Sequence, residues 1–311
     1  MNFTLNILGT ASALPTVHRY PSAQVLDVRG RLFLIDCGEG AQMQMRRMGL
    51  SFLKVDVFCL SHIHGDHLFG LFGLLSTMGM LGRKTPLHVF APRSFGPILK
   101  FFLSYFGEGL RFRIEHHVLS MKEPQQVLET KSLTLTAFPL HHRIEAYGFL
   151  FRETEPLLNV YKDCIGKYGL GIAEIACLKR GEDVVRDGGT ISHKDVTYRP
   201  YDPRSYAYCS DTAPFPELPE WVHGVDLLYH EATFPASMED MAAATFHSTT
   251  VQAAECAAKA GAKRLLVGHY SSRVNDIRSL LDEIVPIFPK AVLASEGDIF
   301  DIPLRRYTDR L

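Results

Sequence analysis

The chain has 311 residues, of which 46% are hydrophobic and 22% charged, a composition typical of a globular protein with a sizeable core. Its formal net charge is −1, so the charge of the whole molecule predicts neither a nucleic acid nor a membrane surface as partner, and any basic binding surface must be local. The six cysteines are scattered without a C-x-x-C pair and the N-terminus lacks the basic segment of a signal peptide, which together predict a cytoplasmic protein.

Up to about residue 151 the chain alternates strand and helix patterns. Strands are expected at 3–8, 22–28, 31–36, 55–60 and 87–91, and helices at about 41–48, 68–82 and 92–106. The strands 22–28 and 31–36 are expected to form a hairpin over Arg29 and Gly30. Further alternating segments, typical of strands, lie near 112–118, 133–138 and 147–151. The charge-free run 68–82 is too short, and too often interrupted by glycine, to cross a bilayer. We interpret it as a buried helix and expect no membrane partner.

The pattern changes between about 152 and 200, where apolar periodicity weakens and glycines and charges increase. Because it interrupts the core pattern, we interpret the segment as an insertion with its own small structure. Lysines and arginines there are matched by about as many acids, so it is not simply a basic arm. The core pattern resumes with strands at 206–209, 225–229, 265–267 and 291–293 and helices at about 249–260, with Ser248 as expected N-cap, and 276–284. Two batches of strands with interspersed helices predict an α/β (α+β) fold of two facing sheets flanked by helices.

Four potential metal ligands follow the predicted strand 55–60 within six residues: His62, His64, Asp66 and His67. In an extended chain alternate side chains share a face about 6.5–7 Å apart, so the first two histidines can bind one ion. Gly65 allows a sharp turn that directs the other two residues at a second ion. Imidazole and carboxylate suit Zn²⁺, Mn²⁺ or Fe. We therefore interpret the loop as a metal site, rather than as a polar loop that is rich in histidine.

Further histidines and acids recur where a predicted apolar strand ends and a loop begins. Strand ends at one edge of a sheet gather in space, so these residues could complete one pocket. They are His141, His142, Asp211, His230, Glu231 and His269. The histidines at 18, 88, 116, 117, 193 and 223 lack this context, and we expect them to be structural or on the surface.

A two-metal hydrolase needs about six to eight ligands around ions about 3.5–4 Å apart, which lower the pKa of a bound water toward 7. The residues supply two ligand sets, with a carboxylate as the bridge and an open position left on each ion. The first set is His62, His64 and one of His141 or His142; the second is Asp66, His67 and His269, with Asp211 shared between them.

With these residues assembled, the sequence resembles the metallo-β-lactamase-fold hydrolases through the H-x-H-x-D-H signature at 62–67, and among them the ribonuclease Z family of tRNA 3′-processing endonucleases. That signature alone establishes the superfamily, whereas His-Glu-Ala-Thr at 230–233 and His-Ser-Thr at 247–249 are much more specific. The match runs over essentially the whole chain. It also includes segments 8–10, 36–40, 61–71, 140–144, 148–149, 210–212 and 268–269, with Gln42.

The resemblance implies a four-layer αββα metallo-β-lactamase sandwich in a single domain, 1–311, and a homodimer. It implies two zinc ions, for which Mn²⁺ or Fe are alternatives. Because the family pattern reads Leu-x-His, it selects His142 rather than His141 as the third ligand of the first ion. The insertion at about 152–200 corresponds to the flexible arm, or exosite, with which these enzymes bind the elbow of tRNA.

We therefore expect a zinc-dependent endoribonuclease that removes the 3′ trailer of precursor tRNA, leaving a 3′-hydroxyl on the tRNA and a 5′-phosphate on the trailer. Asp66 is expected to orient the attacking hydroxide or take its proton, and His247 to act as general acid for the departing 3′-oxygen. Glu231 is expected to hold His247 in the useful tautomer, while a role for His230 stays open. Two alternatives remain: a small-substrate metallo-hydrolase of the same fold (phosphodiesterase, thioesterase or lactamase), and a non-catalytic RNA- or metal-binding relative.

Overall fold

The computed structural model describes residues 2–274 and 276–306. The chain forms two compact units. The described residues of the larger unit fall within 1–129, 134–151 and 205–302, and those of the smaller within 130–133, 152–204 and 303–311. Most of the smaller unit comes from the segment in which the apolar periodicity of the sequence weakens.

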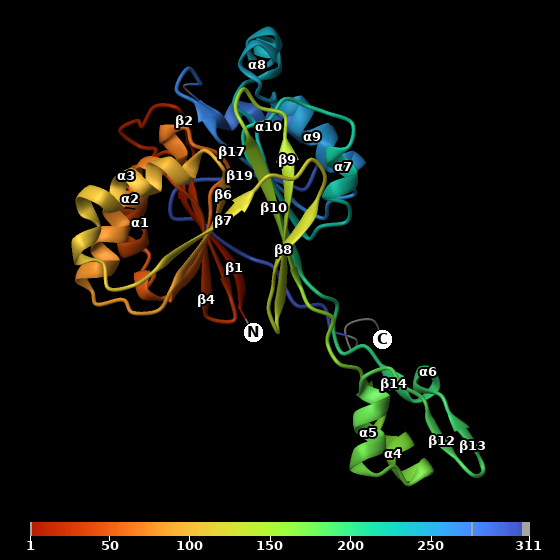
Figure 1. The fold of residues 1–311 in the computed structure, drawn as a ribbon. Helices are drawn as coiled ribbons and strands as arrows, with labels where there is room; N and C mark the ends of the chain where they lie inside the picture. The colour runs from red at the N-terminus through yellow and green to blue at the C-terminus, as the bar shows by residue number, and fades with distance from the viewer. Residues whose placement is uncertain (1, 275, 307–311) are drawn as a thin grey trace. The chain divides into compact units, whose positions relative to one another are not determined.

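The larger unit contains two seven-stranded sheets (Figure 1), ordered β20-β1-β3-β4-β5-β6-β7 and β19-β17-β16-β15-β10-β9-β8. The strands of the first sheet are β1 (Phe3–Gly9), β3 (Ala23–Val28), β4 (Arg31–Cys37), β5 (Val55–Cys59), β6 (Leu87–Pro92), β7 (Ile114–Leu119) and β20 (Ile299–Asp301). Those of the second are β8 (Gln125–Glu129), β9 (Leu133–Leu140), β10 (Ala146–Glu153), β15 (Ser205–Cys209), β16 (Leu227–Glu231), β17 (Leu265–Gly268) and β19 (Ala291–Leu293). A short parallel pair joins β2 (Ala11–Ser12) to β18 (Tyr270–Ser271).

The predicted hairpin over Arg29 and Gly30 is confirmed, since β3 and β4 pair antiparallel on either side of these two residues. Both turn residues have positive φ, 56° and 87°. A two-residue turn of this hand matches the right-handed twist of the flanking strands, and glycine accepts the second position without strain. The local sequence is therefore enough to define this part of the first sheet.

The two sheets pack face to face through the alternate side chains of their strands. Phe33 of β4 meets Phe151 of β10 edge to face, with ring centroids 5.6 Å apart. The buried Tyr206 hydroxyl of β15 donates to Gln24 of β3 in the other sheet. Aromatic rings of this size bury a large apolar area, so the interface between the sheets is a principal source of stability.

Helices cover the outer face of each sheet, which completes the predicted four-layer αββα arrangement (Figure 1). The helices beside the first sheet are α1 (Ala41–Arg47), α2 (Gly65–Met80) and α3 (Phe95–Phe106). Those beside the second are α7 (Leu218–Trp221), α9 (Thr250–Lys259) and α10 (Leu280–Ile284), and α8 (Glu239–Thr245) lies near the start of α9. Across the described residues, no helix combines the length and the apolar character that crossing a membrane requires.

Some expected boundaries are wrong. The N-cap of α9 is Thr249, not Ser248: its hydroxyl accepts from the backbone N–H of Gln252, whose side chain accepts in return from the N–H of Thr249. This reciprocal capping box requires glutamine or glutamate three residues after the cap, and only Thr249 has one. The strand expected at 225–229 runs from Leu227 to Glu231, and the helix expected at 276–284 begins as a 3₁₀ turn at Ile277–Ser279.

The smaller unit has its own small apolar core. Its elements are β11 (Asn159–Val160), α4 (Lys162–Tyr168), α5 (Ile172–Lys179), β12 (Val184–Arg186), β13 (Gly189–Ile191), α6 (His193–Val196) and β14 (Thr197–Tyr198). Leu170, Leu178, Val184 and Val196 are buried together. Because this core is so small, polar contacts support it: the guanidinium of Arg186 bonds both carboxylate oxygens of Glu174.

Candidate metal centre

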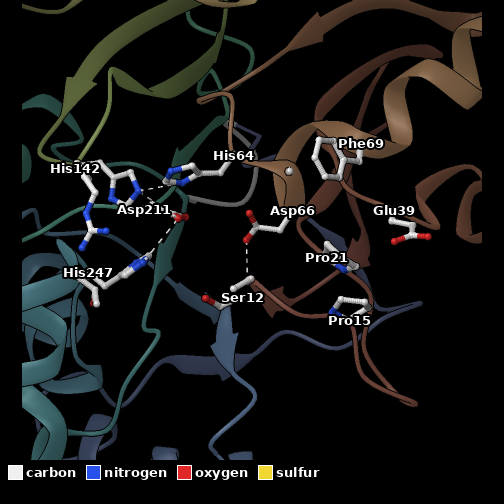
Figure 2. Close-up of a pocket in the computed structure, with 14 residues that line it drawn as sticks. Ser12, Pro15, Pro21, Glu39, His64, Asp66, Phe69, His142, Asp211 and His247 are labelled. Carbon is white, nitrogen blue, oxygen red and sulfur yellow. Dashed lines mark hydrogen bonds and ion pairs between the residues drawn. The ribbon is translucent and has the colours of Figure 1, made fainter.

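Loops at one edge of the larger unit bring together side chains that lie far apart in the sequence. Each follows or ends a strand: β5 leads to His62 and His64, β9 to His142, β15 to Asp211 and β17 to His269. A cavity of about 620 Å³ opens over this edge, and Figure 2 shows several of these side chains, with Asp66 and His247, pointing toward its centre.

Three histidines form one group of nitrogen donors. Nδ1 of His64 lies 3.0 Å from Nε2 of His62 and 3.3 Å from Nε2 of His142. Two donors bound at 2.0–2.1 Å to one tetrahedral ion lie about 3.3 Å apart, so these separations fit a shared ion. Burial lowers the pKa of all three imidazoles, which favours the neutral form that binds metal.

Asp66, His67 and His269 form a second group. Nε2 of His67 lies 3.3 Å from Nε2 of His269, and each of these nitrogens lies 3.5 Å from Oδ2 of Asp66. Asp66 and His67 belong to the first turn of α2, which begins at Gly65 and so turns the chain away from the first group. Burial would lower the pKa of His67, but Asp211 and Asp66 raise it well above its usual value. A bound divalent cation would replace that proton and balance the negative charge of the two carboxylates in its place.

Asp211 lies between the two groups and presents one oxygen to each. Its Oδ2 is 3.5 Å from Nε2 of His62 and 3.8 Å from Nε2 of His142. Its Oδ1 is 3.3 Å from Nε2 of His67 and 3.2 Å from Nε2 of His269. The carboxylate is buried, and a buried acid is stabilised as an anion only by nearby cations or donors. This geometry suits a carboxylate that bridges two ions.

The sequence pattern assigns no role to Asp36, but its carboxylate supports the metal centre by binding one of the predicted ligands, His67. Its buried carboxylate accepts from Nδ1 of His67 at 2.7 Å, from the hydroxyl of Tyr208 at 2.7 Å, and from both the N–H and the hydroxyl of Ser61. The bond to His67 leaves Nε2 of that ring free for a metal. The only local signal is an acid at the end of an apolar strand, and it does not indicate which histidine Asp36 contacts.

Other ligands are also held through the nitrogen that faces away from the centre. Nδ1 of His269 lies 2.9 Å from the hydroxyl of Thr233, and Nδ1 of His142 donates to the backbone carbonyl of Phe246 at 3.0 Å. His269 itself has a positive φ of 63°, a conformation that is uncommon for residues other than glycine. Such support fixes the ring orientation and tautomer of a metal ligand.

His247 and Glu231 form a charged pair beside the two groups. Nδ1 of His247 lies 2.9 Å from Oε1 of Glu231, and its Nε2 lies 4.0 Å from Oδ2 of Asp211. Burial would lower the pKa of His247, but Glu231 raises it by more, to about 9. Glu231 is buried and accepts further bonds from the backbone N–H groups of Thr212, Thr233 and Ser248. The pair is therefore held rigidly, with a protonated nitrogen aimed at the cavity.

The remaining two strand-end histidines lie outside these groups. The ring of His141 stacks on Phe215 at 4.1 Å, and His230 is buried, with Nδ1 donating to the carbonyl of Glu231. His230 lines a different cavity of about 450 Å³ on the side of α9. The structure thus places His142, and not His141, with the donors of the first group.

Comparison with known proteins gives relatives that match nearly the whole chain. A Bacteroides thetaiotaomicron ribonuclease Z is 42% identical over 99% of this chain and 97% of its own, and a Porphyromonas gingivalis ribonuclease Z is 43% identical over 96% and 99%. The crystal structure of the short form of human tRNase Z matches with a TM-score of 0.71 at 24% identity, covering 96% of this chain and 99% of its own. Two family models match: that of the anti-Pycsar protein Apyc1 at residues 3–158, and that of the beta-lactamase superfamily domain at residues 196–270.

Proposed function

The chain belongs to the ribonuclease Z family and, through residues 3–158, to that of the anti-Pycsar protein Apyc1, and we propose that the cavity over the two donor groups is where it cuts the 3′ end of precursor tRNA. It is a metal-dependent endoribonuclease. The ribonuclease Z relatives match nearly its whole length, a span that takes in Asp211, His247 and His269, whereas the Apyc1 match ends before these residues. The observation that carries the assignment is this full-length match, together with the donor set that the fold assembles.

The donors fit two ions of the zinc type. The first would be held by His62, His64 and His142, the second by Asp66, His67 and His269, and Asp211 would contact both. Nitrogen-rich sets with carboxylates suit Zn²⁺, and Mn²⁺ or Fe bind similar ligands. When bound, such ions lower the pKa of water and offset the negative charge of a phosphodiester.

The chain's own residues then divide the remaining work. Asp66 would be a ligand of the second ion. Burial would raise its pKa, but its histidine neighbours lower it by more, so it remains ionised and can orient the attacking water through a hydrogen bond. As water attacks the phosphorus, the bond to the 3′-oxygen of the tRNA breaks. His247 supplies the proton to that oxygen from Nε2, and the phosphate stays on the trailer. Glu231 is a positioning residue, because it acts only through Nδ1 of His247.

The cavity continues along a surface that suits single-stranded RNA. Phe69, on α2, is 66% exposed and lines both this cavity and an adjoining one of about 470 Å³. Exposed aromatic rings stack on unpaired bases regardless of sequence. Arg143 lines the same cavity and offers a guanidinium for a phosphate. We place the nucleotides that flank the cut in this groove.

We propose that the smaller unit is the arm that binds the body of tRNA. Its arginines are largely paired with acids within the unit: Arg180 with Glu182, Arg186 with Glu174, Arg199 with Glu155 and Arg204 with Glu153. Among its described residues, the lysines have no ion pair and are the cations left for phosphate: Lys131, Lys162, Lys167, Lys179 and Lys194. Replacing Lys162, Lys179 and Lys194 by alanine should make the negative slope of log K against log salt concentration less steep by about 2–3. Each phosphate that is no longer bound accounts for about 0.7–0.9 of this change. An unchanged slope would remove the arm from the binding surface.

A homodimer is supported by an exposed apolar surface on α2 and α3, which we call the α2/α3 face and define by Phe72, Ile98, Phe101, Tyr105 and Phe106. The last three rings are 62%, 71% and 61% exposed. A groove of about 480 Å³ runs beside them and is lined almost entirely by apolar side chains. Patches of this kind mark protein–protein contacts. Sedimentation should give a dimer for the wild type and a monomer for Phe101→Ser/Tyr105→Ser; a monomeric wild type would contradict the proposal.

We also place the protein in the cytoplasm. All six cysteines are free, and four of them are buried. Burial raises the pKa of the Cys59 and Cys209 thiols, which keeps them protonated and unreactive. Thiols maintained in this form suit a reducing compartment.

The decisive experiment is cleavage of a precursor tRNA carrying a 3′ trailer, with mapping of both product ends. Asp211→Ala should abolish cutting because both ions lose a ligand, and His247→Ala should slow it by about 10²–10⁴-fold, the usual contribution of a general acid. His142→Ala and His141→Ala form a matched pair, of which only the first should abolish activity.

An intact precursor in the presence of rapid hydrolysis of bis(p-nitrophenyl) phosphate would instead favour a small-substrate hydrolase of the same fold. If neither substrate is cut while zinc still binds, the protein is a non-catalytic relative.

A further inference from the structure

A second set of donors lies away from the cavity, on strands β6 and β7 of the first sheet. His88, Glu115 and His117 each direct one donor atom to a common point, and these atoms lie within 4.8 Å of one another. His88 and Glu115 are direct partners in the parallel pair β6–β7, while His117 is two residues further along β7 and pairs with Phe90. The sheet register therefore puts all three side chains on one face.

The distances within this set match those of the metal centre. Nδ1 of His88 lies 3.1 Å from Nε2 of His117 and 3.3 Å from Oε2 of Glu115. The corresponding separations between histidine nitrogens at the metal centre are 3.0–3.3 Å. About 3.3 Å is the separation expected for two donors of one tetrahedral ion.

Protons alone do not satisfy this arrangement. Nδ1 of His88 carries at most one hydrogen in the plane of its ring, and that hydrogen can make a full-strength bond to the carboxylate or to His117, but not to both. If the nitrogen is unprotonated, it can accept from His117, but its lone pair then faces the carboxylate. A cation at the common point pairs with all three atoms at once.

The surroundings hold the donors in place while leaving them accessible. The ring of His117 stacks on the buried ring of Phe90, with centroids 4.6 Å apart and an angle of 15° between the planes. Arg113 contacts Oε1 of Glu115 at 3.3 Å and leaves Oε2 directed at His88.

We propose that His88, Glu115 and His117 form a separate metal site, which binds a divalent ion of the zinc class (Zn²⁺, Co²⁺ or Ni²⁺). Two imidazoles and one carboxylate select such ions over Mg²⁺ or Ca²⁺, and the remaining coordination position is open to water. β7 is the last strand of its sheet, so the ion ties an edge strand to its only neighbour in that sheet. The site does not depend on the proposed function, because none of its residues lines the cavity.

The test is the number of zinc ions bound per chain by the full-length protein after equilibrium dialysis at a fixed free zinc concentration. The wild type should bind one ion more than His88→Gln/His117→Gln. His116→Gln is the matched control: His116 lies between the two β7 donors but faces the other way, toward Phe95 and the carbonyl of Ala91. It should retain the wild-type count, and RNA cleavage should be unchanged in all variants.

Hydrogen exchange of the peptide 114–119 provides a second readout. Zinc should slow it in the wild type and in His116→Gln, but not in His88→Gln/His117→Gln. Should the double variant fold poorly, Glu115→Gln, which keeps size and register, should lose the ion at a zinc concentration that saturates the wild type. Equal zinc counts in the wild type and His88→Gln/His117→Gln, or hydrogen exchange of the peptide 114–119 that zinc does not slow in the wild type, would overturn the proposal.

Discussion

Replacing Asp36 by asparagine tests whether a residue that touches no predicted metal ion controls the metal centre. The backbone of Asp36 has a positive φ of 52°, a conformation that asparagine tolerates as well as aspartate does. The substitution thus preserves size and backbone. It removes one negative charge and turns one acceptor oxygen into an NH₂ donor.

The expected magnitude follows from the four donors around this carboxylate. Oδ2 accepts from His67, Tyr208 and Ser61, and Oδ1 from the N–H of Ser61. An asparagine NH₂ at either position faces a donor, which costs about 1–3 kcal/mol in a buried site. Loss of a carboxylate behind a metal-bound histidine typically lowers metal affinity or activity by about 10–100-fold, or about 1.4–2.7 kcal/mol.

The assay is zinc titration of the chelator-treated protein, together with precursor cleavage at saturating zinc. Asp36→Asn should bind zinc about 10–100-fold more weakly, and Tyr208→Phe, which removes one donor without touching His67, should have a smaller effect. Asp27→Asn is the control, because Asp27 accepts from the N–H of Gly30 at the exposed hairpin turn, far from the metal centre in the sheet. Wild-type zinc affinity and cleavage in Asp36→Asn would refute the reasoning.

Three further predictions address the chemistry and the packing. The value of kcat/KM should stay high through neutral pH, where His247 is protonated, and fall as pH rises through the pKa of His247. Glu231→Gln removes the charge that raises this pKa, so the alkaline fall should move to lower pH. A pH profile that does not move would contradict the pairing of the two residues. Gly70→Ala should destabilise the fold by about 1–3 kcal/mol in thermal unfolding, because the added Cβ would lie 2.0 Å from the carbonyl oxygen of Gly38. Gly73→Ala is the control: its Cβ would meet only the flexible end of the Gln42 side chain, so the change should be neutral or stabilising. Chelation should abolish cleavage and zinc should restore it; full activity after exhaustive chelation would exclude a metal-dependent reaction.

The sequence by itself determined the features that depend on local pattern. Alternation of apolar residues and the Arg29-Gly30 turn predict the β3–β4 hairpin, because strand period and turn conformation are properties of a few consecutive residues. The ligand loop at 62–67 is predictable for the same reason, since four donors within six residues after an apolar strand indicate a metal site without help from the rest of the chain. Ligands from distant strands are predictable because the ends of neighbouring strands meet at one edge.

Only the tertiary structure decided which side chains meet across strands. Without family resemblance, His141 and His142 are equivalent, and the strand geometry places only His142 with the donors. The contact of Asp36 with His67 depends on the loop that joins β5 to α2, and no local pattern specifies it. The sequence pattern predicts structural or surface histidines at 88 and 117, because neither follows the end of a predicted strand. The pairing of β6 with β7 nevertheless brings them together. Sheet register brings such residues together, and register is a property of the packed fold rather than of either strand alone.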